Sequence, residues 1–266
     1  MTAILDKLHA ILLRDLRSAL RYRGGFALGA AGTLIELAAF YFLARAVGPG
    51  FRPDGMDYFS FLLVGTGFYT LFLTGVTSFL NTVQEAQQTG TLEVLLTTAT
   101  PPSTLVFLSS CSSFAGRVLT FLAYLVLGVL LFGAPLHAAT LPLVAVLLLL
   151  SLAVAVALGI FAAALQIATQ RGSALVWLLG SAWFLTGTMF PVAVLPQPLR
   201  QIARLIPITY SLDGLRQALV EDATFSQLAG SIGLLAGFAA LLLPLSVAVL
   251  NWVVRRARRQ GSLSFY

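Results

Sequence analysis

Charged residues are scarce in this 266-residue chain, where they make up 10% of the sequence, against 58% hydrophobic residues and a mean hydropathy of +0.92. This balance excludes an ordinary soluble globular domain. A stretch of about 20 apolar residues crosses the ~30 Å hydrocarbon core of a bilayer. The apolar stretches of the chain therefore predict an all-α integral membrane protein with six transmembrane helices.

Cysteine, histidine and lysine are almost absent. Cys111 is the only cysteine, and His9 and His137 are the only histidines, which excludes an intrachain disulfide and makes a cysteine- or histidine-based metal centre improbable. Lys7 is the only lysine and has no glycine-rich loop before it, so a P-loop for ATP is excluded. We expect no catalytic residue, no metal site and no cofactor bound by this chain, which is therefore not an enzyme by itself.

Positive charge gathers at the two ends of the sequence. Residues 1–23 combine an apolar stripe at helical spacing with Lys7 and several arginines, which predicts an amphipathic helix in the membrane interface; a helix packed on protein is the alternative. Residues 255–266 form a basic tail. By the positive-inside rule both termini are expected on the cytoplasmic side, and the charge indicates membrane orientation, not nucleic-acid binding. Two features run against the rule: the inner loop at 83–104 has no lysine or arginine, and the outer side holds Arg45, Arg52, Arg200, Arg204 and Arg216.

The transmembrane domain is predicted over residues 24–254. Its spans are expected at about 24–47, 58–82, 105–133, 141–168, 174–190 and 228–254. The segment 191–227 is moderately apolar and is cut by four prolines. We expect it to form short helices in an outer re-entrant hairpin covered by protein, because unpaired peptide groups facing lipid cost several kcal/mol each.

The segment GTLEVLLTTATP, residues 90–101, lies between the second and third expected spans. Leu92, Leu95 and Leu96 share an apolar face and Glu93 lies on the other side, so a short amphipathic helix is predicted within this segment. Such a helix projecting into the cytoplasm can press on a soluble partner. An interfacial loop without a partner is the alternative.

The sequence resembles the permeases of ABC-2 type exporters. That family shows a G-T-L-E-x-L-L stretch followed by T-P after its second span, which corresponds here to residues 90–96 and 100–101. It also shows an F-P, L-P, P-x-T-Y, L-D-x-L-R series between its fifth and sixth spans, which corresponds here to positions between 190 and 216. Family members often carry arginines before the first motif, where this chain has Gln84, Ala86, Gln87 and Gln88.

The resemblance implies a half-transporter in the cytoplasmic membrane. Two permease chains, identical or different, would pair within the membrane lipids and engage two copies of an ABC ATPase that binds the ATP and Mg. The resemblance also implies a cytoplasmic coupling helix at 84–97, which would sit in a cleft of the ATPase. Its implied ATPase contacts are Glu85, Gly90, Thr91, Leu92, Glu93, Leu95 and Leu96. The implied outer gate consists of Phe190, Pro191, Pro196, Pro207, Tyr210, Asp213 and Arg216. Asp213 and Arg216 are three residues apart and could pair on one helical face.

The translocation path is expected to include Glu36, Phe40, Phe68 and Phe72. Glu36 lies about 17 Å along the first span, near mid-bilayer, where an exposed carboxylate is costly. Two interpretations stay open for it, a position on the path or dimer seam and a neutral group hydrogen-bonded to a neighbour. The aromatic side chains either stack on cargo or pack the bundle.

The sequence therefore favours an ATP-driven exporter of a lipid, a hydrophobic drug or a natural product. A permease for a lipid-linked polysaccharide and a secondary transporter are the alternatives. A secondary transporter needs coupling carboxylates in several spans, and only Glu36 is plainly within one.

Overall fold

The computed structural model describes residues 23–90, 102–137 and 140–260, and every regular element in these ranges is helical. The expected all-helical architecture is therefore confirmed for this part of the chain. The expected interfacial helix at 1–23 lies outside the described residues except for Arg23, and so do the last six residues of the basic tail.

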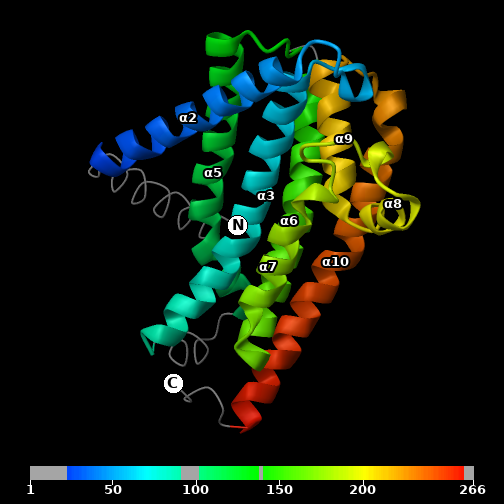
Figure 1. Ribbon diagram of the computed structural model, residues 1–266. Helices are drawn as coiled ribbons and strands as arrows, with labels where there is room; N and C mark the ends of the chain where they lie inside the picture. The colour runs from blue at the N-terminus through cyan, green and yellow to red at the C-terminus, as the bar shows by residue number, and fades with distance from the viewer. Residues whose placement is uncertain (1–22, 91–101, 138–139, 261–266) are drawn as a thin grey trace.

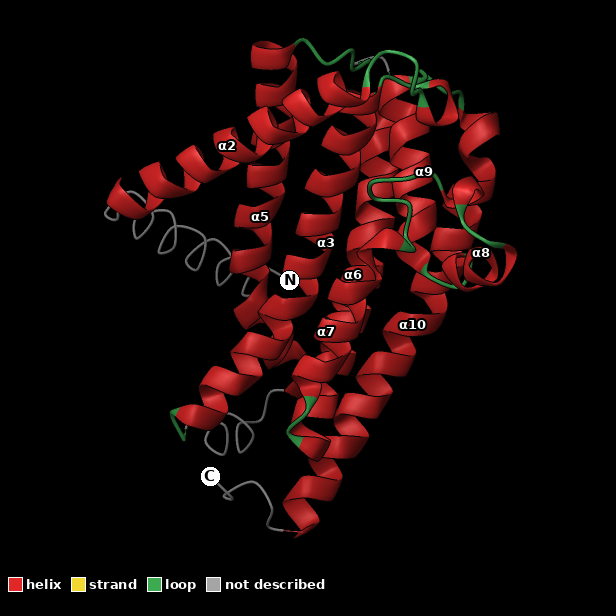
Figure 2. Ribbon diagram, in the orientation of Figure 1, coloured by secondary structure: helices red, strands yellow, loops and turns green. Residues whose placement is uncertain are grey.

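Five long helices make up most of the bundle: α2 (Arg23–Val47), α3 (Tyr58–Gln88), α5 (Pro102–Phe132), α6 (Leu141–Thr169) and α10 (Phe225–Gln260). The shorter elements are η1 (Pro53–Gly55), α7 (Gly172–Ser181), η2 (Ala182–Phe184), η3 (Val192–Val194), α8 (Gln197–Ala203) and α9 (Pro207–Val220). In Figure 1, α3, α5, α6 and α10 run between the two ends of the bundle, while α2 slants away from it. Figure 2 shows that loops are confined to short connections.

Four described segments are long and apolar enough to cross a membrane, namely Ala27–Val47, Tyr58–Gln88, Leu141–Thr169 and Phe225–Ala257. They coincide with the first, second, fourth and sixth expected spans. The third and fifth expected spans correspond to shorter apolar helices, Gly116–Phe132 and Gly172–Phe184. The count of six spans therefore stays a prediction.

The expected fifth span at 174–190 is not one continuous helix. Helical structure from Gly172 ends at Phe184, which gives about 20 Å, less than the ~30 Å hydrocarbon core. Gly187 then adopts a left-handed backbone with φ +81°, which a continuing α-helix does not allow. Beyond this turn the chain continues through η3 and α8 before α9.

Local chemistry explains where several helices begin and end. The carboxylate of Asp57 accepts a hydrogen bond from the Ser60 amide, 3.1 Å away, and caps the start of α3. Gly48, with φ +91°, donates its amide to Ala44 O and ends α2. Gln170 ends α6 in the left-handed region, with its amide bonded to Gln166 O.

The central helix of the bundle is α3, which packs against α2, α5, α6, α7 and α9. Its side chains Phe61, Leu62, Leu63, Val64 and Phe68 are fully buried. The pairs α3–α6 and α6–α10 form the most extensive contacts, and small residues let them approach. A Cβ at Gly159 of α6, for example, would lie 2.7 Å from the Phe79 ring.

The two ends of the bundle are distinct. At one end, here called the Gln88 end, lie the C-terminal ends of α3 and α10 and the turn between α6 and α7 (Figure 1). The opposite end, here called the Asp57 end, carries the turn before α3, the α5–α6 connection and the α9–α10 turn. A hydrogen bond from the His137 amide to Leu219 O, 2.7 Å, joins two of these connections.

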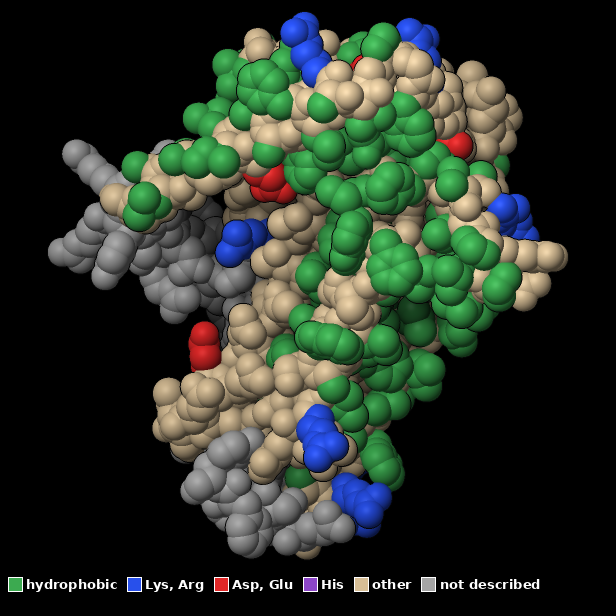
Figure 3. All heavy atoms as spheres, viewed as in Figure 1, with side chains coloured by type: hydrophobic (Ala, Val, Ile, Leu, Met, Phe, Trp, Pro, Cys, Tyr) green, Lys and Arg blue, Asp and Glu red, His purple; other side chains and the backbone are tan. Residues whose placement is uncertain are grey.

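Large apolar side chains are exposed from α7 through η2 and η3 to the turn after α8. They are Trp177, Leu178, Trp183, Phe184, Phe190, Val194, Ile202 and Leu205. Figure 3 shows apolar side chains gathered over this region and few charged ones on the viewed face. A surface of this kind is stable against lipid or against another apolar protein surface.

Candidate functional site

The described part of the expected ATPase contact lies at the C-terminal end of α3. Helix α3 continues to Gln88, so residues 84–88 belong to the long helix and do not begin a separate one. Glu85 is exposed in its last turn, and Gly90 follows with a left-handed backbone at φ +68°. The remaining expected contacts, Thr91, Leu92, Glu93, Leu95 and Leu96, lie outside the described residues.

A buried glutamine cluster ties this end of α3 to α6 and to the α6–α7 turn. The Gln166 amide group donates to Gln87 Oε1 at 3.0 Å, and Gln166 Oε1 accepts from the Gly172 amide at 3.0 Å. Gln84 adds a longer contact of 3.5 Å to the same oxygen. Gln87 and Gln166 are both buried. Gln84 and Gln87, which stand where family members often have arginines, are therefore engaged inside the bundle.

Sequence reasoning missed this cluster. Gln166 lies within the expected fourth span. A lone amide inside an apolar span indicates a buried partner, because an unpaired amide there is costly. Gly172 completes the arrangement, since a Cβ at this position would lie 2.7 Å from the Gln166 side chain and 2.6 Å from Leu80.

The four residues expected along the translocation path occupy different environments. Phe68 and Phe72 are buried in the main core, with their ring centroids 6.2 Å apart and Phe68 6.1 Å from Phe121. Phe40 is half-buried against the same core. Glu36 is exposed on α2. The packing role of the phenylalanines is thus visible, and their role along a path stays a prediction.

The expected outer gate is built from η3, α8 and α9. Helix α9 packs between α3, α6 and α10, whereas α8 contacts mainly η3. Hydrogen bonds within the segment hold its shape: Tyr210 donates to Arg204 O at 2.8 Å, and Thr209 donates to Ala203 O at 2.9 Å. Pro191 is buried, Pro207 is half-buried, and Phe190 and Pro196 are exposed.

Arg216 is the residue that fastens α9 to the bundle. Only 2% of its surface is exposed, and its guanidinium makes four hydrogen bonds, all to main-chain carbonyls. Nε and Nη2 donate to Phe61 O at 3.3 and 3.0 Å, Nη1 donates to Gly187 O at 2.7 Å, and Nη2 also donates to Thr188 O at 2.8 Å. One side chain therefore joins α3, the turn after η2, and α9.

The expected pairing of Arg216 with Asp213 is not what satisfies the guanidinium. The spacing of three residues places both on neighbouring parts of α9, but the buried carbonyls of the Gly187 turn have no helical partner and compete for the same donors. The Phe61 ring also covers the guanidinium, with Arg216 Cζ 3.4 Å from the ring centroid.

Gly65 makes room for this contact. A Cβ at Gly65 would meet Arg216 Nη2 and Thr188 O at distances that no side chain adopts. Any larger residue at this position in α3 would therefore push the guanidinium and the Thr188 carbonyl away. Gly65 was not among the predicted site residues, because a glycine inside an apolar span gives no sign of what faces it.

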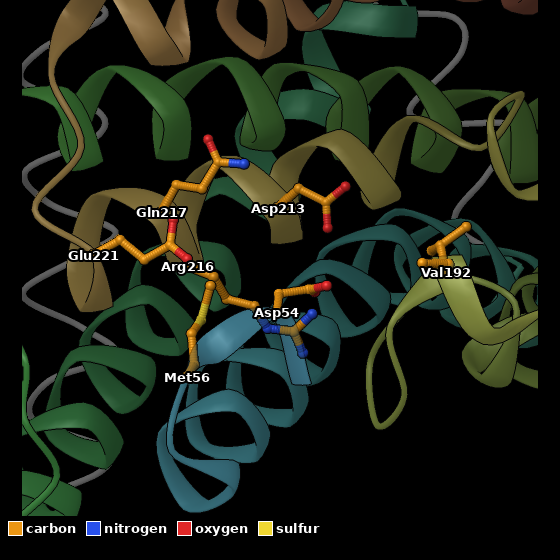
Figure 4. A pocket seen from close by; sticks show the side chains of 8 residues that line it. Asp54, Met56, Val192, Asp213, Arg216, Gln217 and Glu221 are labelled. Carbon is orange, nitrogen blue, oxygen red and sulfur yellow. The ribbon is translucent and has the colours of Figure 1, made fainter. Parts of the chain in front are cut away.

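A small polar cavity of about 240 Å³ opens beside Arg216 at the Asp57 end. Asp54 from the turn before α3 lies across it from Asp213 and Glu221, as Figure 4 shows. Glu221 follows the last residue of α9, and its pKa is raised by partial burial and, to a smaller extent, by the nearby Asp54 carboxylate. The cavity thus concentrates negative charge around one buried arginine.

Comparison with known protein families identifies one match. A model described as "ABC-2 family transporter protein" matches residues 49–248, from the turn before α3 to the second half of α10. No curated protein matches the chain.

Proposed function

The chain belongs to the ABC-2 transporter family, and from this membership we propose that it is the permease subunit of an exporter that moves a lipid, hydrophobic drug or natural product outward. Permeases of this family are membrane transport subunits that work with an ATPase subunit. We propose that two permease chains, identical or different, assemble with two ATPase copies in the cytoplasmic membrane. ATP and Mg would be bound by the ATPase.

The continuity of α3 is the observation that carries the proposal. Its 31 residues extend about 46 Å as one helix. About 36 Å of this length separates Phe61, whose carbonyl Arg216 holds, from the exposed Glu85, which precedes the GTLEVLL segment in the sequence. A rigid rod of this kind can carry a displacement at the ATPase contact to the outer gate. In alternating access, packed helices likewise move as rigid bodies and open the two sides of the membrane in turn.

Charge placement supports the proposed orientation. The exposed arginines Arg171, Arg255, Arg256 and Arg259 lie on the α6–α7 turn and the last turns of α10, at the Gln88 end. By the positive-inside rule this end faces the cytoplasm, which is also where an ATPase would bind. The gate residues of α9 then lie towards the outside.

The chemistry of the interior supports an apolar cargo. Among the described residues, Arg216 is the only charged side chain that is buried, and its donors are occupied by the protein. A long polar cargo needs many polar groups along its route. The side chains packed around α3 are mostly phenylalanines and leucines, so a path that opened between these helices would be apolar.

Transport in reconstituted vesicles tests this function. The permease and its ATPase would be reconstituted together, and ATP-dependent export of a fluorescent phospholipid would be compared with export of a hydrophobic dye. We expect export of one of these only with ATP and ATPase present. Export by the permease alone, or ATP-driven uptake in place of export, would contradict the proposal.

A further inference from the structure

A larger cavity, of about 650 Å³, lies at the Asp57 end between the end of α2, the start of α3 and the end of α5. This volume is within the range of small-molecule sites in proteins. The cavity is separate from the one beside Arg216, and neither the ATPase contact nor the gate contributes a residue to it. We call it the α2–α3–α5 cavity.

Aromatic rings form one wall of the α2–α3–α5 cavity. Tyr41, Phe59 and Phe132, one from each helix, lie with ring centroids 5.0 to 5.7 Å apart. Phe59 is buried, whereas Tyr41 and Phe132 are half-buried and keep part of their surface open. Such a wall favours contact with an apolar or amphipathic molecule.

Two arginines also line the cavity. Arg45 stands in the last turn of α2, with its Cζ 5.2 Å from the Tyr41 ring centroid, and Arg52 stands in the loop before α3. Both are exposed, and within the described residues neither guanidinium makes a hydrogen bond or an ion pair. The one carboxylate in the lining, Asp57, already accepts the Ser60 amide as the cap of α3.

A structural role explains the position of Arg45 but not that of Arg52. Arg45 is favourable near the C-terminal end of α2, where the helix dipole is negative. Arg52 is in no helix and has no such reason to be there. Both arginines also stand at the end that the positive-inside rule leaves poor in basic residues. Two unpaired guanidiniums beside an aromatic wall are suited to an anion that carries an apolar part.

We propose that the α2–α3–α5 cavity binds an anionic phospholipid of the outer leaflet, with its phosphate between Arg45 and Arg52 and its apolar part against Tyr41, Phe59 and Phe132. The lipid fills space that α2, which has little contact with the rest of the bundle, leaves open. It thereby joins α2 to α3 and α5. The assignment to the outer leaflet rests on the orientation given under the proposed function, whereas binding concerns the permease alone and requires no export.

Binding of dansyl-labelled phosphatidylglycerol to the full-length permease in detergent micelles tests the proposal. We expect binding that dansyl-phosphatidylcholine with the same acyl chains does not match. The double variant Arg45→Gln/Arg52→Gln should bind phosphatidylglycerol about tenfold or more weakly, because the phosphate loses both of its charge-assisted hydrogen bonds. The double variant Arg45→Lys/Arg52→Lys should keep much of the affinity.

Arg204→Gln is the matched control, since Arg204 is also exposed but does not line this cavity. It should leave binding unchanged. Equal binding of the two lipids, or unchanged affinity in the glutamine double variant, would overturn the proposal. Displacement of the lipid by inorganic phosphate at the same concentration would also overturn it, because the aromatic wall would then contribute nothing.

Discussion

Replacement of Arg216 by methionine tests the fastening of α9 to α3. Methionine preserves most of the apolar stem but removes all four hydrogen bonds. The carbonyls of Gly187 and Thr188 lose the donors that the structure gives them, and an unsatisfied buried carbonyl costs about 1–3 kcal/mol. Relief of the desolvation of the guanidinium offsets part of this cost. We expect a net loss of about 2–4 kcal/mol of stability.

Gly65→Ala perturbs the same contact from the side of α3. The added methyl group would displace the guanidinium and the Thr188 carbonyl, and overpacking of this kind costs typically 1–3 kcal/mol. Gly237→Ala in α10 is the matched control, because a Cβ there meets nothing within 4 Å. Since both glycines lie inside helices, the difference between the two variants isolates the contact with Arg216.

The assay is the midpoint of thermal unfolding in detergent micelles, measured for both variants and for the controls Arg204→Met and Gly237→Ala. Arg216→Met and Gly65→Ala should lower the midpoint, and the controls should not. The double variant Gly65→Ala/Arg216→Met should lose less stability than the sum of the two single losses, because both substitutions act on one contact. A midpoint for Arg216→Met equal to that of Arg204→Met would refute the reasoning.

Three further outcomes are expected. Leu92→Asp should leave the permease folded but uncouple ATP hydrolysis from export in vesicles, and normal coupling would contradict the ATPase contact. Gln166→Leu should lower the unfolding midpoint, by roughly 1–3 kcal/mol of stability, because it leaves the Gly172 amide without its acceptor, whereas the exposed Gln201→Leu should not. Folding raises the pKa of the Glu221 carboxyl, so the folded state binds this proton more tightly than the unfolded state does. The stability that Glu221 contributes is therefore full below its unfolded pKa and is lost as pH rises through its folded pKa. In Glu221→Gln the thermal unfolding midpoint should therefore fall less between about pH 4.5 and pH 7 than it does in the unchanged protein. An equal fall in both proteins would contradict the raised pKa of Glu221.

Local sequence signals predicted most of the helix boundaries. The starts of α3 and α6 at Tyr58 and Leu141 agree with the expected spans, because turn-forming residues and prolines precede long apolar runs there. The end of α3 was predicted six residues too early. The prediction assigned Gln84 and Gln87 to a separate coupling helix at 84–97, whereas both belong to α3 and contact Gln166 of α6. A partner 79 residues away in the sequence cannot be inferred from local polarity.

The outer segment shows the same limit. The prolines correctly indicated short, broken helices between 191 and 227, and Arg216 was among the predicted residues. Its hydrogen-bond partners were not predicted, because helical spacing considers only neighbours on α9, such as Asp213. The carbonyls that it binds come from α3 and from a turn set by the positive φ of Gly187. Their position depends on tertiary packing, as does the role of Gly65.

Both ends of α3 are held by polar side chains from distant parts of the chain. Arg216 holds its Phe61 carbonyl near the Asp57 end, and Gln166 holds its Gln87 side chain near the Gln88 end. Polar contacts buried among apolar helices are directional, so each fixes the rotation of α3 as well as its position. A helix fixed at both ends moves together with its partners α6 and α9. Under the proposed function, a push on the segment after Gln88 would therefore reach the α9 gate through α3 itself, without a separate chain of contacts across the core.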